Sequence, residues 1–268
     1  MTSTAPARLG LRAVALGYLA VLVMVPLGMI LYRALEHGFT AFWESVTTPA
    51  SISAINLSLI IVAIVVPLNV VFGVVTALAL ARGRFRGRRI LETVVDIPFA
   101  VSPVVVGVSL ILLWGVDGWL GGLADHGIRI IFSLPGMVIA TTFVTLPFVV
   151  REVEPVLHEI GNDQEQAAAT LGASWRQTFW RITLPAIRWG LAYGVVLTVA
   201  RSLGEFGALI IVAGGVAGES QTLTLLVHSR YIDDHNVYGA YASATVLMGL
   251  AILTLSLMTF LNRKREAT

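Results

Sequence analysis

The sequence predicts an all-α membrane protein with six transmembrane helices, and three observations support this prediction. Hydrophobic residues make up 56% of the 268 residues, whereas charged residues make up only 13%. A soluble domain usually carries about 25% charged residues, roughly twice that share. The apolar residues also form long runs, and a helix needs about 20 apolar residues to cross a bilayer core about 30 Å thick. We therefore expect a single transmembrane domain over residues 1–268, with no sizeable domain outside the membrane.

The expected spans follow the apolar runs in chain order. They are Leu11–Tyr32, Ile52–Leu80, Ile97–Val116, Ile130–Val150, Ile187–Val212 and Val237–Leu261. The first run lacks a small-residue cleavage pattern, so we interpret it as a retained span and not as a signal peptide. Pro98 and Pro103 predict an irregular or kinked start of the third span. Arg201 and Glu205 interrupt the fifth.

Arginine and lysine predict the orientation, because short loops rich in these residues stay on the cytoplasmic side of a membrane. With the N-terminus in the cytoplasm, only Arg33, Arg129 and Arg230 fall outside. Fourteen fall inside: Arg8, Arg12, Arg82, Arg84, Arg86, Arg88, Arg89, Arg151, Arg176, Arg181, Arg188, Arg263, Lys264 and Arg265. Both termini are therefore expected in the cytoplasm. The loop Arg82–Arg89 is best interpreted as a topology anchor against anionic lipid, since it lies between two spans.

A long cytoplasmic segment, about residues 151–185, separates the fourth and fifth spans. Asp163 and Gln166 have the spacing of a capping box, which predicts a short helix. Gly172 is expected to end this helix in the left-handed conformation.

A second short helix is predicted to start at Ser174, because Gln177 repeats the capping spacing. Trp175, Phe179 and Ile182 form its apolar stripe. Two interpretations of this helix pair stay open: a docking element for another protein, or an amphipathic helix that rests on lipid.

The segment Gln166–Pro185 resembles the signature loop of ABC-importer permeases. That signature reads E-A-A, three residues, G, nine residues, I-x-L-P. The matching residues are Ala167, Ala168, Gly172, Ile182, Leu184 and Pro185. Gln166 stands where the signature has Glu, and Glu165 directly precedes it. The resemblance implies a coupling helix, formed by these eight residues and their neighbours, that fits into a groove of an ATPase subunit.

Three further stretches resemble the sulfate and molybdate branch of these permeases: Asp96–Gly107, Ala200–Ala208 and Gln221–Asn236. Within that branch the chain is most similar to the W-type subunit of sulfate/thiosulfate importers. The resemblance implies a type I importer permease fold in a bacterial inner membrane. It also implies a T-type permease partner, two ATPase subunits that bind ATP and Mg²⁺, and an external sulfate-binding protein. A molybdate or tungstate importer permease is the alternative, and a secondary anion transporter is a weaker one.

Arg201 and Glu205 are charged residues within a predicted span, where each costs about 2.5–3.5 kcal/mol to insert. Four residues apart, they share one face of a helix. One interpretation places them on the anion pathway or its gate, and the other makes them an internal ion pair that locks helices together. Gly204 and Gly207 would allow either bending or close helix packing.

The sequence does not contain the motifs of a catalytic subunit. It contains no G-x-x-x-x-G-K-[ST], no G-x-S-x-G and no H-E-x-x-H. Its five His residues form no ligand-like cluster, and it has no Cys. We expect a chain that is not an enzyme, binds no cofactor or metal of its own, and does not bind nucleic acid.

Overall fold

The computed structural model describes residues 5–122, 126–127 and 129–266, and these ranges contain helices and no strand. The longer helices are α1 (Ala5–Leu35), α3 (Pro49–Arg82), α7 (Leu134–Ile160), α10 (Leu184–Leu203) and α13 (Val237–Glu266). The shorter ones are α2 (Gly38–Val46), α4 (Arg88–Ala100), α5 (Pro103–Trp114), α8 (Asp163–Thr170), α9 (Trp175–Thr178), α11 (Leu209–Val212) and α12 (Leu223–His228). Two π-helical turns complete the set, η1 (Phe179–Thr183) and η2 (Ser229–Asp233).

Among the described residues, five helical stretches are long and apolar enough to cross a membrane. They are Arg12–Leu35, Pro49–Arg82, Leu134–Ile160, Trp175–Leu203 and Val237–Phe260. The pair α4 and α5 passes the same test together and brings the number to six if it counts as one span. The prediction of an all-α chain with six crossings is confirmed when α4 and α5 together count as one span.

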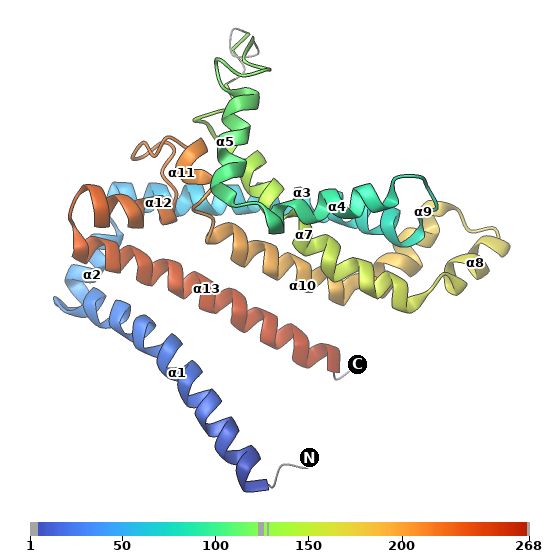
Figure 1. The fold of residues 1–268 in the computed structure, drawn as a ribbon, viewed down its shortest axis with the longest axis horizontal. Helices are drawn as coiled ribbons and strands as arrows, with labels where there is room; N and C mark the ends of the chain where they lie inside the picture. Colours follow the sequence, from blue (N-terminus) through green and yellow to red (C-terminus); the bar gives the residue numbers. More distant parts are fainter. Residues whose placement is uncertain (1–4, 123–125, 128, 267–268) are drawn as a thin grey trace.

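The third span is not the single helix that was expected over Ile97–Val116. It starts earlier, at Arg88, and consists of α4 and α5, whose axes differ by 112°. Proline disfavours the helical conformation of the residue before it, and Ser102, before Pro103, has an extended backbone with ψ of 135°. The predicted irregularity is therefore confirmed at Pro103, whereas Pro98 lies inside α4. At Pro103 the chain turns so far that α5 projects away from the bundle (Figure 1).

The centre of the bundle is α7, which makes its most extensive contacts with α3 and α10. One core cluster joins Val74 and Leu80 of α3, Val149 and Val153 of α7, and Ile187 of α10. Small residues allow helices in a membrane to approach closely. Gly73 does this here, because a Cβ at that position would lie 2.6 Å from the Cβ of Val149. By contrast, α1 buries none of its central apolar residues and diverges from the bundle (Figure 1).

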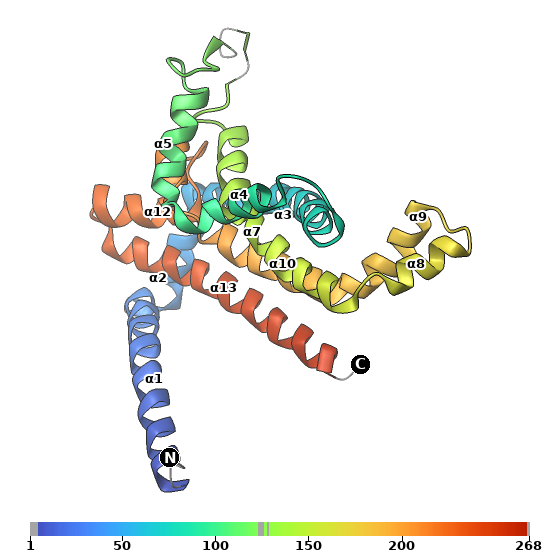
Figure 2. The ribbon, with the colours of Figure 1, turned by 45° about the vertical axis from the view of Figure 1, so that its right-hand side comes forward.

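The bundle has two distinct ends. The arginine-rich loop between α3 and α4, the segment α8–α9 and the C-terminal end of α13 lie at one end (Figure 1), and Figure 2 shows α8 and α9 extending beyond it. The helices α2 and α12 lie at the opposite end (Figure 1). The arginine-rich loop and the segment α8–α9 therefore lie at the same end of the bundle (Figure 1 and Figure 2).

Candidate functional site

The turn between α8 and α9 has the conformation that the sequence predicts. Gly172 has a φ of +84°, in the left-handed region that favours glycine. Its N–H donates to the carbonyl of Ala169 at 3.0 Å, and the N–H of Ala173 donates to the carbonyl of Ala168 at 3.0 Å. These two bonds form a Schellman motif, which ends α8 by satisfying its last carbonyls. The chain therefore reverses sharply at Gly172.

The start of α9 matches its prediction, whereas the start of α8 does not. Ser174 accepts a hydrogen bond from the N–H of Gln177, and the Gln177 side chain accepts one from the Ser174 N–H, so this capping box is present. The capping box expected at Asp163 is wrong, because Asp163 is the first helical residue and Asn162 holds the N-cap without a side-chain bond. The backbone carbonyl of Asn162 accepts the first helical hydrogen bond, from the N–H of Gln166 at 2.9 Å, so the helix begins one residue earlier than expected.

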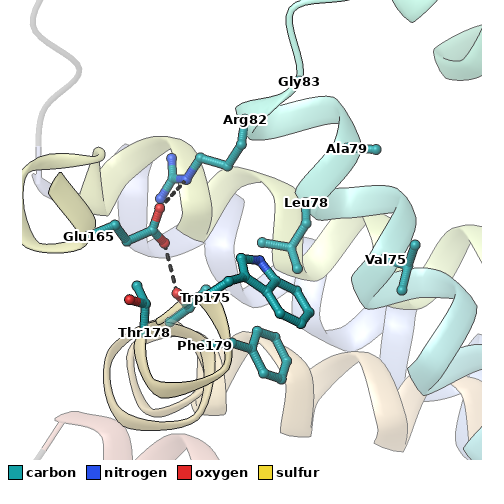
Figure 3. A pocket seen from close by; sticks show the side chains of 10 residues that line it. Val75, Leu78, Ala79, Arg82, Gly83, Glu165, Trp175, Thr178 and Phe179 are labelled. Carbon is teal, nitrogen blue, oxygen red and sulfur yellow. Dashed lines mark hydrogen bonds and ion pairs between the residues drawn. The ribbon is translucent and has the colours of Figure 1, made fainter. Parts of the chain in front are cut away.

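Glu165 is the anchor of this segment. It forms an ion pair with Nε of Arg82 at 3.1 Å and accepts a hydrogen bond from the Thr183 hydroxyl at 2.8 Å (Figure 3). Arg82 also donates to the carbonyls of Leu157 at 2.8 Å and Gly161 at 2.6 Å. The end of α3 is thereby tied to the end of α7, to α8 and to η1. An acidic side chain thus forms this ion pair one residue before the position at which the signature has Glu, while Gln166 lies exposed.

The other residues of the signature form two groups, one at the exposed turn and one where the segment joins the helix bundle. Gly172 and Ile182 line a shallow cavity of about 330 Å³ together with Leu171, which is 88% exposed. Ala167 is exposed and Ala168 half-buried. Leu184 packs against the core of α3, α7 and α10, and Pro185 lies exposed in the first turn of α10. The structure thus brings Gly172 and Ile182 together around an exposed leucine, and uses Leu184 to hold the segment to the bundle.

Arg201 and Glu205 form an ion pair, but not on the continuous fifth helix that was expected over Ile187–Val212. Helix α10 ends at Leu203, and the chain becomes helical again only at Leu209, the start of α11. Nη1 of Arg201 lies 2.7 Å from Oε2 of Glu205, although the angles there are not those of an aligned hydrogen bond. The carboxylate of Glu205 is fully buried, whereas the Arg201 side chain is 32% exposed.

The break in this span has local causes. Oε1 of Glu205 accepts a hydrogen bond from the N–H of Ala208 at 2.8 Å, which caps the next helical turn. The carbonyl of Glu205 accepts another from the Thr224 hydroxyl at 2.8 Å. Gly207 lies against α5, since a Cβ there would be 3.0 Å from Pro103. Both residues of the ion pair therefore lie at the corner between α10 and α11.

Arg230 was interpreted from the sequence as an outer-loop cation only, yet its side chain is buried. Among the described residues no carboxylate pairs with it. Its guanidinium donates to the carbonyls of Ser45 and Gly239 and to the hydroxyls of Thr48, Ser51 and Ser243. Burial lowers the pKa of Arg230 from its ordinary value. This residue joins α2, α3 and α13 at the end of the bundle opposite Arg82.

A second polar contact that the sequence analysis missed lies between spans. Nδ2 of Asn69, in the middle of α3, donates to the Thr145 hydroxyl of α7 at 2.6 Å, and both residues are fully buried. An amide within a long apolar run is the signal that could have identified it. Within the described ranges no three His, Asp or Glu side chains lie close enough to hold a metal ion.

The fold is that of an integral membrane protein: a bundle of membrane-spanning helices with an anchored helical turn at one end. Residues 69–267 match the family described as binding-protein-dependent transport system inner membrane component. The match covers most of the chain, and the chain belongs to this family.

Comparison with individual relatives shows which members of the family this chain resembles. The chain is 47% identical to the sulfate transport system permease protein CysW of Synechocystis sp., over 95% of this chain and 92% of that protein. It is 45% identical to CysW of Escherichia coli, over 92% and 85% of the two chains. Identity to the CysT permease of Escherichia coli is 35%, over 89% and 86%. The resemblance to W-type subunits is therefore confirmed.

A solved structure supports the fold. The crystal structure of a bacterial ABC transporter that imports the acidic polysaccharide alginate contains a chain that matches with a TM-score of 0.77, over 96% of this chain and 94% of that one. Sequence identity to it is 16%, so this likeness concerns the fold alone.

Proposed function

We propose that this chain is one permease subunit of an ATP-driven importer that moves sulfate, and also thiosulfate, into the bacterial cell. The observation that carries the proposal is the coupling segment: the turn at Gly172, the anchor at Glu165 and the exposed Leu171 occur in a chain 44–47% identical to CysW sulfate permeases. Sulfate is a small dianion and cannot cross a bilayer unaided. The importer therefore needs a path through such subunits.

In this proposal ATP and Mg²⁺ bind to partner ATPase subunits, because the chain has no phosphate-binding G-x-x-x-x-G-K-[ST] loop. The site for the ATPase is the coupling surface around Leu171, Gly172 and Ile182. Its exposed leucine can insert into a groove of the partner, as buried anchors do at protein interfaces.

A displacement of this surface can be transmitted to the membrane-spanning helices. Helices α9 and α10, with η1 between them, form one helical stretch of 29 residues from Trp175 to Leu203, about 40 Å long. This rod begins at the coupling surface and ends at Arg201 and the corner before Glu205. The ion pair of Glu165 with Arg82 passes the same displacement to α3. Movement of the ATPases would therefore shift the corner at the far end of α10.

Arg201 is the residue that we assign to the anion pathway, and Glu205 the residue that positions it. Nη1 of Arg201 contacts Glu205, and the guanidinium has further N–H donors on a side chain that is 32% exposed. Such donors form strong, charge-assisted hydrogen bonds with an oxyanion. Glu205 orients the guanidinium and offsets its charge, so that the site attracts sulfate without retaining it.

The assembly that follows contains this chain, a T-type permease, two ATPase subunits and an external sulfate-binding protein. Both termini and the coupling segment face the cytoplasm, in keeping with the arginines that collect at that end of the bundle. The alternation between inward- and outward-facing states would then occur at the contact between the two permeases.

Uptake of labelled sulfate into liposomes that contain the purified importer tests the proposal. We expect uptake that requires both ATP inside, where the ATPases lie, and the binding protein outside. Molybdate and tungstate serve as competing anions in the same assay. Uptake by this chain alone, driven by a proton gradient without ATP, would replace the proposal by a secondary transporter.

A further inference from the structure

A cavity of about 470 Å³ separates the end of α3 from the coupling segment. Val75, Leu78 and Ala79 of α3 form one wall, and Trp175 and Phe179 form the other (Figure 3). The two aromatic rings stack with centroids 5.8 Å apart, and Trp175 is 74% exposed. The volume lies within the range of about 300–1,000 Å³ that is typical of ligand sites. The aromatic stripe of the coupling segment therefore faces an apolar space beside α3.

The charged groups at the edge of this cavity are already engaged. Arg82 and Glu165 pair with each other, and the second oxygen of Glu165 accepts from Thr183 (Figure 3). Neither is left to bind the polar group of a small soluble ligand, whereas the rest of the lining is largely apolar. The occupant that fits is hydrocarbon.

Unpaired positive charge lies next to the cavity. Arg84 and Arg86 follow Gly83, which lines the cavity, and neither forms an ion pair or hydrogen bond with the described residues. The ring of Phe85 lies between them in sequence and packs against Gly83, since a Cβ at Gly83 would be 3.0 Å from it. Phe85 is nevertheless 45% exposed. An exposed aromatic ring flanked by two free arginines is typical of a segment at the membrane surface.

We infer that this site binds an anionic phospholipid, with an acyl chain in the cavity between α3 and the Trp175–Phe179 pair and the phosphate beside Arg84 and Arg86. The segment Val75–Arg82 covers about 10 Å of helix, so one lipid spans the distance from apolar wall to arginine loop. The bilayer supplies this ligand at high local concentration. The site places a lipid against the coupling segment itself, and the inference does not depend on which anion the importer carries.

The importer that contains this chain is reconstituted into nanodiscs of phosphatidylcholine and phosphatidylglycerol in equal amounts, and the lipids retained on purification are measured by native mass spectrometry. The wild-type protein should retain phosphatidylglycerol in preference to phosphatidylcholine. Arg84→Gln and Arg86→Gln should each lower this preference about fivefold, which corresponds to about 1 kcal/mol for a cation near a membrane surface. Arg84→Lys keeps the charge and should keep the preference.

The cavity is tested separately by filling it. Ala79→Trp should remove the retained lipid, with Ala79→Leu as a milder variant, whereas Val71→Trp on an exposed part of α3 outside the cavity should not. Retention in the proportions of the bulk membrane, or equal retention by Ala79→Trp and wild type, would overturn the inference. A photoreactive residue at Leu78 that crosslinks to a protein subunit and not to lipid would also overturn it, and would show that another subunit fills the cavity.

Discussion

Replacing Arg201 and Glu205 by glutamine, singly and together, separates a role in transport from a role in architecture. The two single variants should differ because the partners differ in burial. Arg201→Gln leaves the fully buried Glu205 carboxylate without its cation, which costs about 3–5 kcal/mol. Glu205→Gln leaves a cation that is 32% exposed and keeps an oxygen to accept from Ala208, so its cost is about 1 kcal/mol. Recovery of assembled importer should fall much more in the first variant.

The double variant restores neutrality inside the corner and should restore most of the assembly. Its transport, however, should remain low. Loss of a charge-assisted hydrogen bond between Arg201 and the passing oxyanion removes about 1.5–3 kcal/mol, which slows uptake about 10- to 150-fold.

The assay is ATP-dependent sulfate uptake in liposomes, divided by the amount of intact complex recovered from membranes. Glu205→Gln alone shows what loss of the positioning carboxylate does to uptake while the arginine remains in an assembled complex. Uptake near the wild-type value in the double variant would refute the pathway role and leave the pair as a structural element of the α10–α11 corner.

Three further predictions concern the coupling segment and the topology. Gly172→Val should leave the complex assembled but lower sulfate uptake per ATP hydrolysed, because a β-branched residue at φ of +84° is strained by about 1–3 kcal/mol. Gly172→Asn is the control, because asparagine tolerates this conformation. Normal coupling of uptake to ATP hydrolysis in the valine variant would contradict the assignment of the coupling segment. A double-mutant cycle of Arg82→Gln and Glu165→Gln, followed by thermal unfolding of the complex, should give a coupling energy of about 0.5–3 kcal/mol, whereas strict additivity would show that the ion pair does not anchor the loop. Single cysteines at the exposed Phe85 and Val216 should react with an impermeant reagent from the cytoplasmic and the outer side, respectively, and reaction of both from one side would remove a crossing from the topology.

Features set by a few neighbouring residues could be predicted from the sequence. The reversal at Gly172 and the capping box of Ser174 with Gln177 depend on hydrogen bonds within about five residues, and both are present. The error at Asp163 is one residue, since the N-cap is Asn162, whose side chain makes no capping bond. The apolar runs likewise locate the spans, since the bilayer imposes their length.

The breaks within spans were harder to predict. Prolines and glycines mark where a helix can bend, but the size of the bend depends on what packs there. The 112° turn between α4 and α5 places Pro103 against Gly207, and the end of α10 depends on the bond from Ala208 to Glu205. Such contacts join two segments, and the pattern within one segment cannot reveal them.

The partners of long-range polar contacts could not be predicted. Arg82 and Glu165 are 83 residues apart, and Arg230 bonds to Ser45 across 185 residues. Counting arginines in loops predicts the orientation of the chain, but it treats each arginine as a charge in water. It cannot indicate which of them turns inward to organise the ends of the helices.

The hydrogen-bond acceptors around Arg230 determine how this part of the protein responds to pH. Its acceptors are two backbone carbonyls and three hydroxyls, and none of these groups gains or loses a proton in ordinary aqueous environments. A joint between helices that relied on a carboxylate would weaken whenever acid protonated it. The hydrogen bonds from Arg230 to α2, α3 and α13 have no such weakness, so acidification of the medium that bathes this end of the bundle should leave these bonds intact.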